Sequence, residues 1–192
     1  MDRRDVAIAG HSGDERTARL GLGSDDGSVR STALGALARM GRLIADDLRL
    51  SLGDTDPRVR RRAAELAKDH PEVDLLGALD DRDPLVAEAA AYALGERPAD
   101  PDVVAALSTV ATGHSDALVR EAAIAALGSI GDEAGLPAIL RGTTDKPTVR
   151  RRAVLALAPF EGDEVDAALQ RALTDRDWQV RQAAEDLLEY RP

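Results

Sequence analysis

The chain repeats itself about every thirty residues. A valine followed four residues later by alanine recurs six times, at spacings of 30, 27, 33, 30 and 31 residues. The valines are Val29, Val59, Val86, Val119, Val149 and Val180. A leucine or alanine stands eight residues after each of them, and offsets of zero, four and eight share one face of an α-helix. The repeat therefore predicts six helices that bury the same face in register.

Most of these helices carry a start signal. An aspartate precedes the valine by three residues in five units, and these residues are Asp26, Asp56, Asp83, Asp116 and Asp177. Proline follows the capping position at Pro57, Pro84 and Pro147. An N-cap aspartate accepts free N–H groups, and proline fits the first helical position. The fifth unit has Lys146 at the cap, so we expect a looser or shifted start there.

A second, shorter apolar segment precedes each of these helices. These segments cover residues 14–22, 42–52, 71–79, 101–111, 134–142 and 163–173. Each unit is thus predicted to be a helix, a turn and a second helix, and stacked units bury one continuous core. The expected fold is all-α, a right-handed α-solenoid of about six units, at 14–40, 42–68, 71–95, 101–130, 132–158 and 162–190. Together these units form a single domain, 14–192, preceded by residues 1–13 as a short capping helix or a flexible arm, because "GHSGD" is expected to break a helix.

The repeating unit resembles a known family. Segments such as "DTDPRVRRRAAELA" and "DRDPLVAEAAAYALG" look like the HEAT repeat, in particular the short bacterial type named after phycobilisome lyases. The resemblance covers residues 14 to 190 and implies that the second helix of each unit lines a concave surface. It also implies a ladder of ion pairs and hydrogen bonds between neighbouring units. The ladder implied by resemblance joins Asp26, Asp56, Asp83, Asp116 and Asp177 with Arg30, Arg60, Arg120, Arg150 and Arg181, and Ala87 is expected to interrupt it.

Several arginines lie outside the repeat pattern. Arg61, Arg62, Arg151 and Arg152 stand where other units carry small or acidic residues. Outward offsets on the second helices predict a groove, and its expected lining is Arg58, Arg61, Arg62, Leu85, Glu88, Tyr92, Leu118, Glu121, Arg151, Arg152 and Leu155. One interpretation is a solvated charged face. The other is an apolar centre with basic flanks, which suits an acidic peptide or helix with aliphatic anchors and makes Tyr92 the expected hot spot.

Two aromatic residues are expected to serve packing. Trp178 takes the place that proline holds in other units and lies in the last unit, where a solenoid must cover its end. Phe160 stands in the turn after the fifth unit and is expected to fill the core between units.

No catalytic, cofactor or metal site is predicted. The chain has no cysteine, and its three histidines, His11, His70 and His114, are not at metal-ligand spacing. The His-Glu pairs of the HEAT-repeat hydroxylases, phosphate-binding loops and dinucleotide fingerprints do not occur. No apolar run has the length of a signal peptide core or a membrane helix, so we expect a cytoplasmic protein.

Three classes of function stay open. The first is a protein-binding scaffold or adaptor with a protein or peptide partner, because solenoids present long surfaces. The second is a nucleic-acid binder that resembles the HEAT-like DNA alkylation repair glycosylases; the arginine clusters favour it, while the net charge of −10 and the 2% aromatic content oppose it. The third is a lyase or chromophore-handling subunit, after the name of the repeat type.

Overall fold

The computed structural model describes residues 2–189, and all regular structure in that range is helical. The chain divides into two compact units, Met1–Ala93 and Leu94–Pro192, which we call the N-terminal unit and the C-terminal unit. Helix α6 (Pro84–Gly95) crosses the division. The two units are described separately below.

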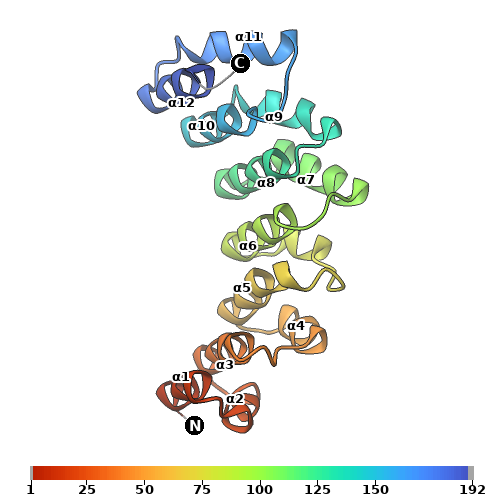
Figure 1. Ribbon diagram of the computed structural model, residues 1–192, viewed down its shortest axis with the longest axis vertical. Coiled ribbons are helices and arrows are strands. Elements are labelled where there is room, and N and C mark those ends of the chain that lie inside the picture. The colour runs from red at the N-terminus through yellow and green to blue at the C-terminus, as the bar shows by residue number, and fades with distance from the viewer. Residues whose placement is uncertain (1, 190–192) are drawn as a thin grey trace. The chain divides into compact units, whose positions relative to one another are not determined.

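The N-terminal unit has two layers of helices. Its other helices are α1 (Arg3–Ser12), α2 (Glu15–Gly21), α3 (Gly27–Arg39), α4 (Ala45–Leu52) and α5 (Pro57–Leu66). Helix α3 packs against both α1 and α5, while α2 packs on α3 and α4 packs on α5 (Figure 1). Helices α1, α3, α5 and the first part of α6 expose what we call the second-helix face of this unit.

The C-terminal unit repeats this arrangement. Its helices are α7 (Pro101–Gly113), α8 (Ala117–Ile130), α9 (Leu136–Gly142), α10 (Pro147–Ala156), α11 (Asp163–Ala172) and α12 (Trp178–Glu189). Helix α10 packs against both α8 and α12, and α7 packs against α8 and α9 (Figure 1). Its second-helix face is formed by α8, α10 and α12.

The second helices begin where the sequence predicts. Asp26, Asp56 and Asp116 each accept a hydrogen bond from the backbone N–H two residues further on, and the helix follows directly. The expected shift in the fifth unit is wrong, because α10 begins at Pro147 in register with the others. Lys146 provides no side-chain cap there, but proline presets the backbone dihedral of the first turn.

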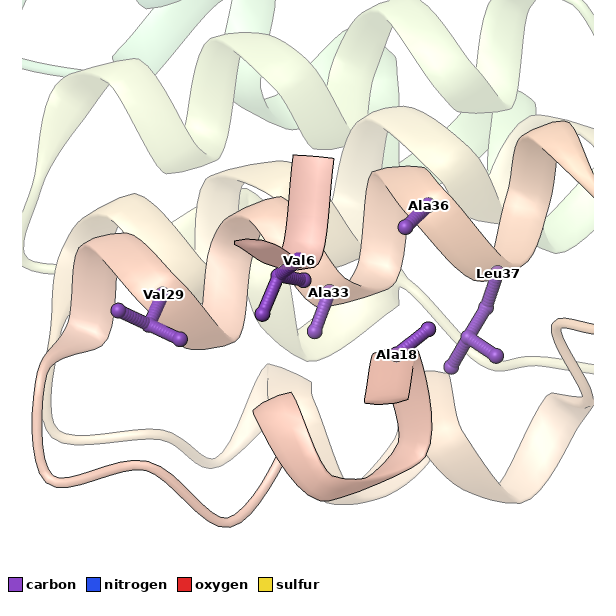
Figure 2. Packing of buried hydrophobic residues seen from close by; sticks show 6 residues of the cluster. All are labelled: Val6, Ala18, Val29, Ala33, Ala36 and Leu37. Atoms are coloured by element: carbon purple, nitrogen blue, oxygen red, sulfur yellow. The ribbon is translucent and has the colours of Figure 1, made fainter. Parts of the chain in front are cut away.

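Helix α1, Arg3–Ser12, packs as part of the N-terminal unit. Helix α1 runs through Gly10 and ends at Ser12, with Gly13 in the left-handed conformation at φ 80°. The sequence predicts that "GHSGD" breaks any helix in this segment. The structure corrects this prediction, because α1 continues through Gly10 and His11 and its C-cap is Gly13. A Cβ atom added at Gly10 would lie 2.9 Å from the Cα atom of Ala36, so the glycine allows close contact between α1 and α3. Val6 is fully buried with the core residues of α2 and α3 (Figure 2).

The third repeat, residues 71–95, lacks its first α-helix. Residues 71–79 were expected to form one, but the structure has only a 3₁₀ turn at Leu76–Asp80. The valine of this repeat follows the preceding one after only 27 residues, the shortest of the spacings, and Gly77 disfavours a helix interior. Val73, Leu75 and Leu79 are nevertheless buried, so the segment fills the core without being an α-helix.

Phe160 and Trp178, the two aromatic residues expected to serve packing, differ in their exposure. Phe160 is fully buried, as expected from the sequence. Trp178 is 63% exposed, so its expected packing role is wrong. It occupies the first position of α12, before the buried Val180, and this position faces away from the core.

We expect Gly128→Ala to lower the free energy of unfolding by about 1–3 kcal/mol, the usual cost of overpacking. A Cβ atom at Gly128 would lie 2.8 Å from the Cα atom of Ala156 and 2.7 Å from its Cβ atom, so α8 and α10 would have to separate. Urea denaturation followed by circular dichroism measures the change. Gly113→Ala is the matched control, since Gly113 has open space around it and lies at the end of α7. Equal losses in both variants would contradict the close-packing argument.

Candidate functional site

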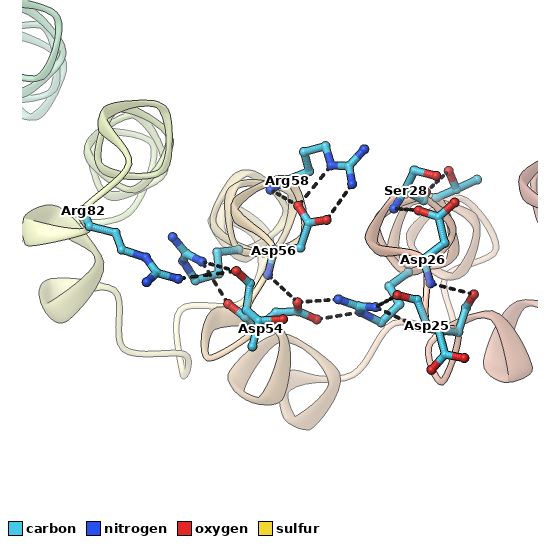
Figure 3. Close-up of polar contacts among 12 residues, drawn as sticks. Asp25, Asp26, Ser28, Asp54, Asp56, Arg58 and Arg82 are labelled. Carbon is cyan, nitrogen blue, oxygen red and sulfur yellow. Dashed lines mark hydrogen bonds and ion pairs between the residues drawn. The ribbon is translucent and has the colours of Figure 1, made fainter.

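Four arginines join consecutive loops by paired hydrogen bonds. Arg30 donates from Nε and Nη2 to the carboxylate of Asp54, at 2.7 and 2.6 Å. Its Nη1 donates to the carbonyl oxygen of Ser24 in the preceding loop at 2.7 Å. The same forked geometry joins Arg60 to Asp81, Arg120 to Asp145 and Arg150 to Asp175. Each guanidinium group thus holds its own loop and the next loop together. Figure 3 shows the polar contacts around Asp54 and Asp56 in the N-terminal unit.

The aspartates of this ladder differ from those implied by the resemblance. The expected partners Asp26, Asp56, Asp83, Asp116 and Asp177 instead accept the backbone N–H two residues further on. A carboxylate turned toward its own helix start is not directed at the neighbouring arginine. The paired aspartate stands earlier in the loop; Asp54, for example, also accepts the N–H of Asp56 at 2.8 Å. Arg181 donates to the carbonyl oxygen of Asp175 in its own loop.

The environment keeps these pairs ionised. Arg60 and Arg150 are only 5% and 6% exposed. Hydrogen bonds from the guanidinium groups lower the pKa of Asp54, Asp81, Asp145 and Asp175, which outweighs the opposing effect of burial. These bonds occupy Arg30, Arg60, Arg120 and Arg150 in holding consecutive loops together.

The third unit supplies no arginine to this ladder. Ala87 stands at the arginine position and has no guanidinium group. The loop of the fourth unit has His114 at the position of the paired aspartate. His114 Nδ1 accepts the N–H of Asp116 at 3.1 Å, so it keeps the local turn that an aspartate makes in other loops.

The predicted groove residues of the N-terminal unit are exposed or partly exposed. Arg58 forms a forked pair with Asp56, the cap of its own helix. Arg61 and Arg62 both donate to the carboxylate of Glu65, at 2.9 and 3.0 Å. The apolar members of the set remain open: Leu85 is 43% exposed and Tyr92 is 52% exposed, while Glu88 is half-buried.

The predicted groove residues of the C-terminal unit are also exposed or partly exposed. Leu118 is 37% exposed, and Leu155 is half-buried. Arg152 Nε lies 3.5 Å from a carboxylate oxygen of Glu121, which joins α10 to α8. Arg151 is exposed and forms no ion pair with any residue that the structure describes.

Two further arginines belong to the second-helix face of the N-terminal unit. Arg3 on α1 and Arg39 on α3 line hollows of about 300 and 260 Å³, together with Arg62 and small or hydroxyl-bearing residues of α3. Sequence reasoning missed Arg3 because it left residues 1–13 as a possible arm, and it missed Arg39 because the hollow that Arg39 lines is completed by α1. The cap Asp2 and the buried spacing of Val6 and Ala9 were the signals of a helix.

Neither a candidate metal site nor a membrane-spanning helix occurs in the part of the chain that the structure describes. Within residues 2–189, no group of three or more histidine or acidic side chains is placed to hold a metal ion. Among the described helices, none combines the length and apolar character that crossing a bilayer requires.

Stacked helix pairs joined by loop-to-loop ion pairs define an α-helical repeat protein of the solenoid class. The family comparison agrees with this class: residues 72–158 match HEAT repeats, and residues 149–175 match the PBS lyase HEAT-like repeat. The chain is therefore a HEAT-repeat protein of the PBS lyase HEAT-like type. No curated protein matches the sequence.

Solved structures show the same fold. An engineered protein matches over 92% of this chain and 95% of its own, with 23% identity and a TM-score of 0.63. Human deoxyhypusine hydroxylase in complex with glycerol matches over 97% of this chain and 77% of its own, with 21% identity and a TM-score of 0.52. A designed armadillo repeat protein in complex with the peptide (KR)4 matches over 97% and 85%, with 15% identity and a TM-score of 0.50. At these identities the likeness concerns the fold alone.

Proposed function

We propose that this chain is a non-catalytic scaffold whose second-helix faces bind a segment of a partner protein. The observation that carries the proposal is the exposure of Tyr92 and Leu85 on one helix, α6, in a chain with few aromatic residues. Both project from a helix whose other face is buried around Val86 and Ala90. Large apolar side chains on a folded surface are typical anchors for a partner.

The charges of the same faces favour an acidic partner. Arg58, Arg61 and Arg62 lie on the second-helix face of the N-terminal unit, and Arg151 and Arg152 lie on that of the C-terminal unit. Arginine binds carboxylates with two parallel hydrogen bonds, which gives orientation as well as attraction. A designed armadillo repeat protein of similar fold has been solved in complex with the basic peptide (KR)4, so a helical repeat protein of this kind can bind a peptide. In our chain the exposed arginines suit a peptide of the opposite charge.

The test compares partner binding by two matched double variants. In Leu85→Ser/Tyr92→Ser the apolar pair of α6 is removed, and in Ile44→Ser/Leu50→Ser a still more exposed apolar pair is removed near α4. A partner is first captured from the native cell with the unmodified chain and then purified, and its affinity for each variant is measured by calorimetry. We expect the α6 variant to bind at least about 2 kcal/mol more weakly, the usual size of a hot-spot effect.

The α4 variant serves as the control for nonspecific apolar contact. Its affinity for the partner should equal that of the unmodified chain, because its changed residues lie away from the second-helix face. Equal affinity of both variants would contradict the proposed surface, and a loss confined to the α4 variant would move the binding surface to the first helices.

A further inference from the structure

The N-terminal unit contains a concentration of positive charge at one place on its second-helix face. Two adjoining hollows share Arg3, Ser31, Thr32 and Arg62 as lining residues. The first hollow adds Arg58 and Arg61, with Glu65 as its acidic residue, and the second adds Arg39 and His11. We call these two spaces together the arginine hollow.

Internal ion pairs neutralise only part of this charge. Arg58 is held by Asp56, and Arg61 and Arg62 share the single carboxylate of Glu65. Arg3 and Arg39 form no ion pair with any of residues 2–189. The arginine hollow is thus lined by five arginines and one acidic residue, although the chain has a net charge of −10, and this local excess of positive charge favours a localised anion.

Neighbouring residues position the arginines of this hollow. Arg3 Nε donates to Thr32 Oγ1 at 3.2 Å, and that hydroxyl donates in turn to the carbonyl oxygen of Ser28 at 2.7 Å. A Cβ atom at Gly35 would lie 3.0 Å from Arg62 Nη2, so the glycine leaves room for this guanidinium group over α3. Arginines from α1, α3 and α5 are thereby gathered around a face made of small residues and hydroxyl groups.

We propose that the arginine hollow binds a phosphoryl group carried by a side chain of the partner protein. This inference rests on the proposed scaffold function and names the chemistry that one of its faces recognises. A phosphorylated side chain has a charge near −2 and three acceptor oxygens, so it can use several guanidinium groups and a serine hydroxyl at once. A single carboxylate has fewer acceptor positions and would leave part of the donor set unpaired.

A phosphorylated protein segment suits this hollow better than a nucleic acid. No phenylalanine, tyrosine or tryptophan lines either space, so bases would have only His11 and the guanidinium groups to stack on. The net charge of the chain also repels a long polyanion, whereas one phosphoryl group is exposed mainly to the local field.

The experiment is a titration of the full ¹⁵N-labelled chain, with the arginine side-chain Nε–Hε signals followed by NMR. The probes are the end-blocked tripeptides Gly-phosphoserine-Gly and Gly-Glu-Gly, inorganic phosphate and a uridine tetranucleotide, all at the same ionic strength. We expect saturable shifts at Arg3, Arg39 and Arg62 with the phosphoserine peptide, at an affinity about tenfold above that of the glutamate peptide. Inorganic phosphate should move the same signals, because it offers the same acceptor chemistry in free form, and it should bind more weakly than the peptide.

Two variants test whether the arginine hollow is responsible for the preference for the phosphoserine peptide. Arg3→Gln/Arg39→Gln should abolish the preference for phosphoserine without unfolding the chain, since both residues are exposed. Arg171→Gln, an exposed change on α11 of the C-terminal unit, should preserve that preference. The phosphoryl inference is overturned by equal affinity for the phosphoserine and glutamate peptides, by tightest binding of free phosphate or of the tetranucleotide, or by no shift at all. None of these outcomes changes the Leu85 and Tyr92 test, which decides the scaffold proposal separately.

Discussion

Replacing Arg150 by methionine is expected to lower the free energy of unfolding by about 3–5 kcal/mol, the cost typical of removing one partner of a buried ion pair. The side chains of Arg150 and Asp175 are only 8% and 15% exposed, and the carboxylate would be left without its forked partner. The carbonyl oxygen of Asp145 would also lose the hydrogen bond from Arg150 Nη1. Methionine retains most of the apolar stem, so the loss measures the polar contacts. Urea denaturation at pH 7 gives the value.

The neighbouring residue provides the control for this change. Arg151→Met removes the same charge from the same helix at an exposed position, and it should change stability by less than about 0.5 kcal/mol.

The pH dependence of the stability difference between wild type and Arg150→Met distinguishes loss of the ion pair from loss of packing. Arg150 lowers the pKa of Asp175 below that of an unfolded aspartate, about 3.9, so the stabilisation is fully present above pH 4 and disappears as the pH falls through the lowered pKa. The difference between wild type and Arg150→Met should therefore narrow below pH 4, and a difference that is constant with pH would argue against the ion pair.

Phe160→Ala is expected to cost about 3–5 kcal/mol, the range for truncating a fully buried aromatic side chain. Phe160 has no exposed surface and lies in the turn between α10 and α11, where alanine would leave a cavity in the C-terminal unit. Thermal unfolding followed by circular dichroism should show a large fall in Tm. Phe160→Leu keeps most of the volume and should retain most of the stability.

Trp178→Ala is the contrasting variant, because the sequence suggests the same packing role for both aromatic residues. The side chain of Trp178 is largely exposed, so its removal should cost less than about 1 kcal/mol. A loss as large as that of Phe160→Ala would mean that Trp178 is covered in solution.

The periodic part of the fold was predictable from the sequence. Val29, Val59, Val86, Val119, Val149 and Val180 are all buried, and the second helices begin at the residues that follow the predicted caps. Caps and one-sided apolar spacing act within a few residues, so the local chain carries this information. The start of α10 is the exception in detail: a missing cap did not shift it, because Pro147 and the buried Val149 hold the register.

The candidate site was predictable only in part. The exposure of Tyr92 and Leu85 follows from helical offsets, whereas the pairing of Arg61 and Arg62 with Glu65 depends on side-chain conformations that spacing does not specify. Arg3 and Arg39 were missed because their position depends on α1 packing against α3, a contact between residues about thirty positions apart.

By itself, the sequence determined the all-α repeat, the buried valine of each unit and the break in the arginine series at Ala87, because each depends on residue identity and local spacing. Only the tertiary structure decided which aspartate pairs with each arginine, since the loops before α5, α6 and α12 each carry two aspartates close together and the helix start engages one of them. It also decided that residues 71–79 fill the core without an α-helix and that α1 completes the arginine hollow. These outcomes depend on contacts between neighbouring repeats, and the local secondary-structure propensity of a segment does not determine such contacts.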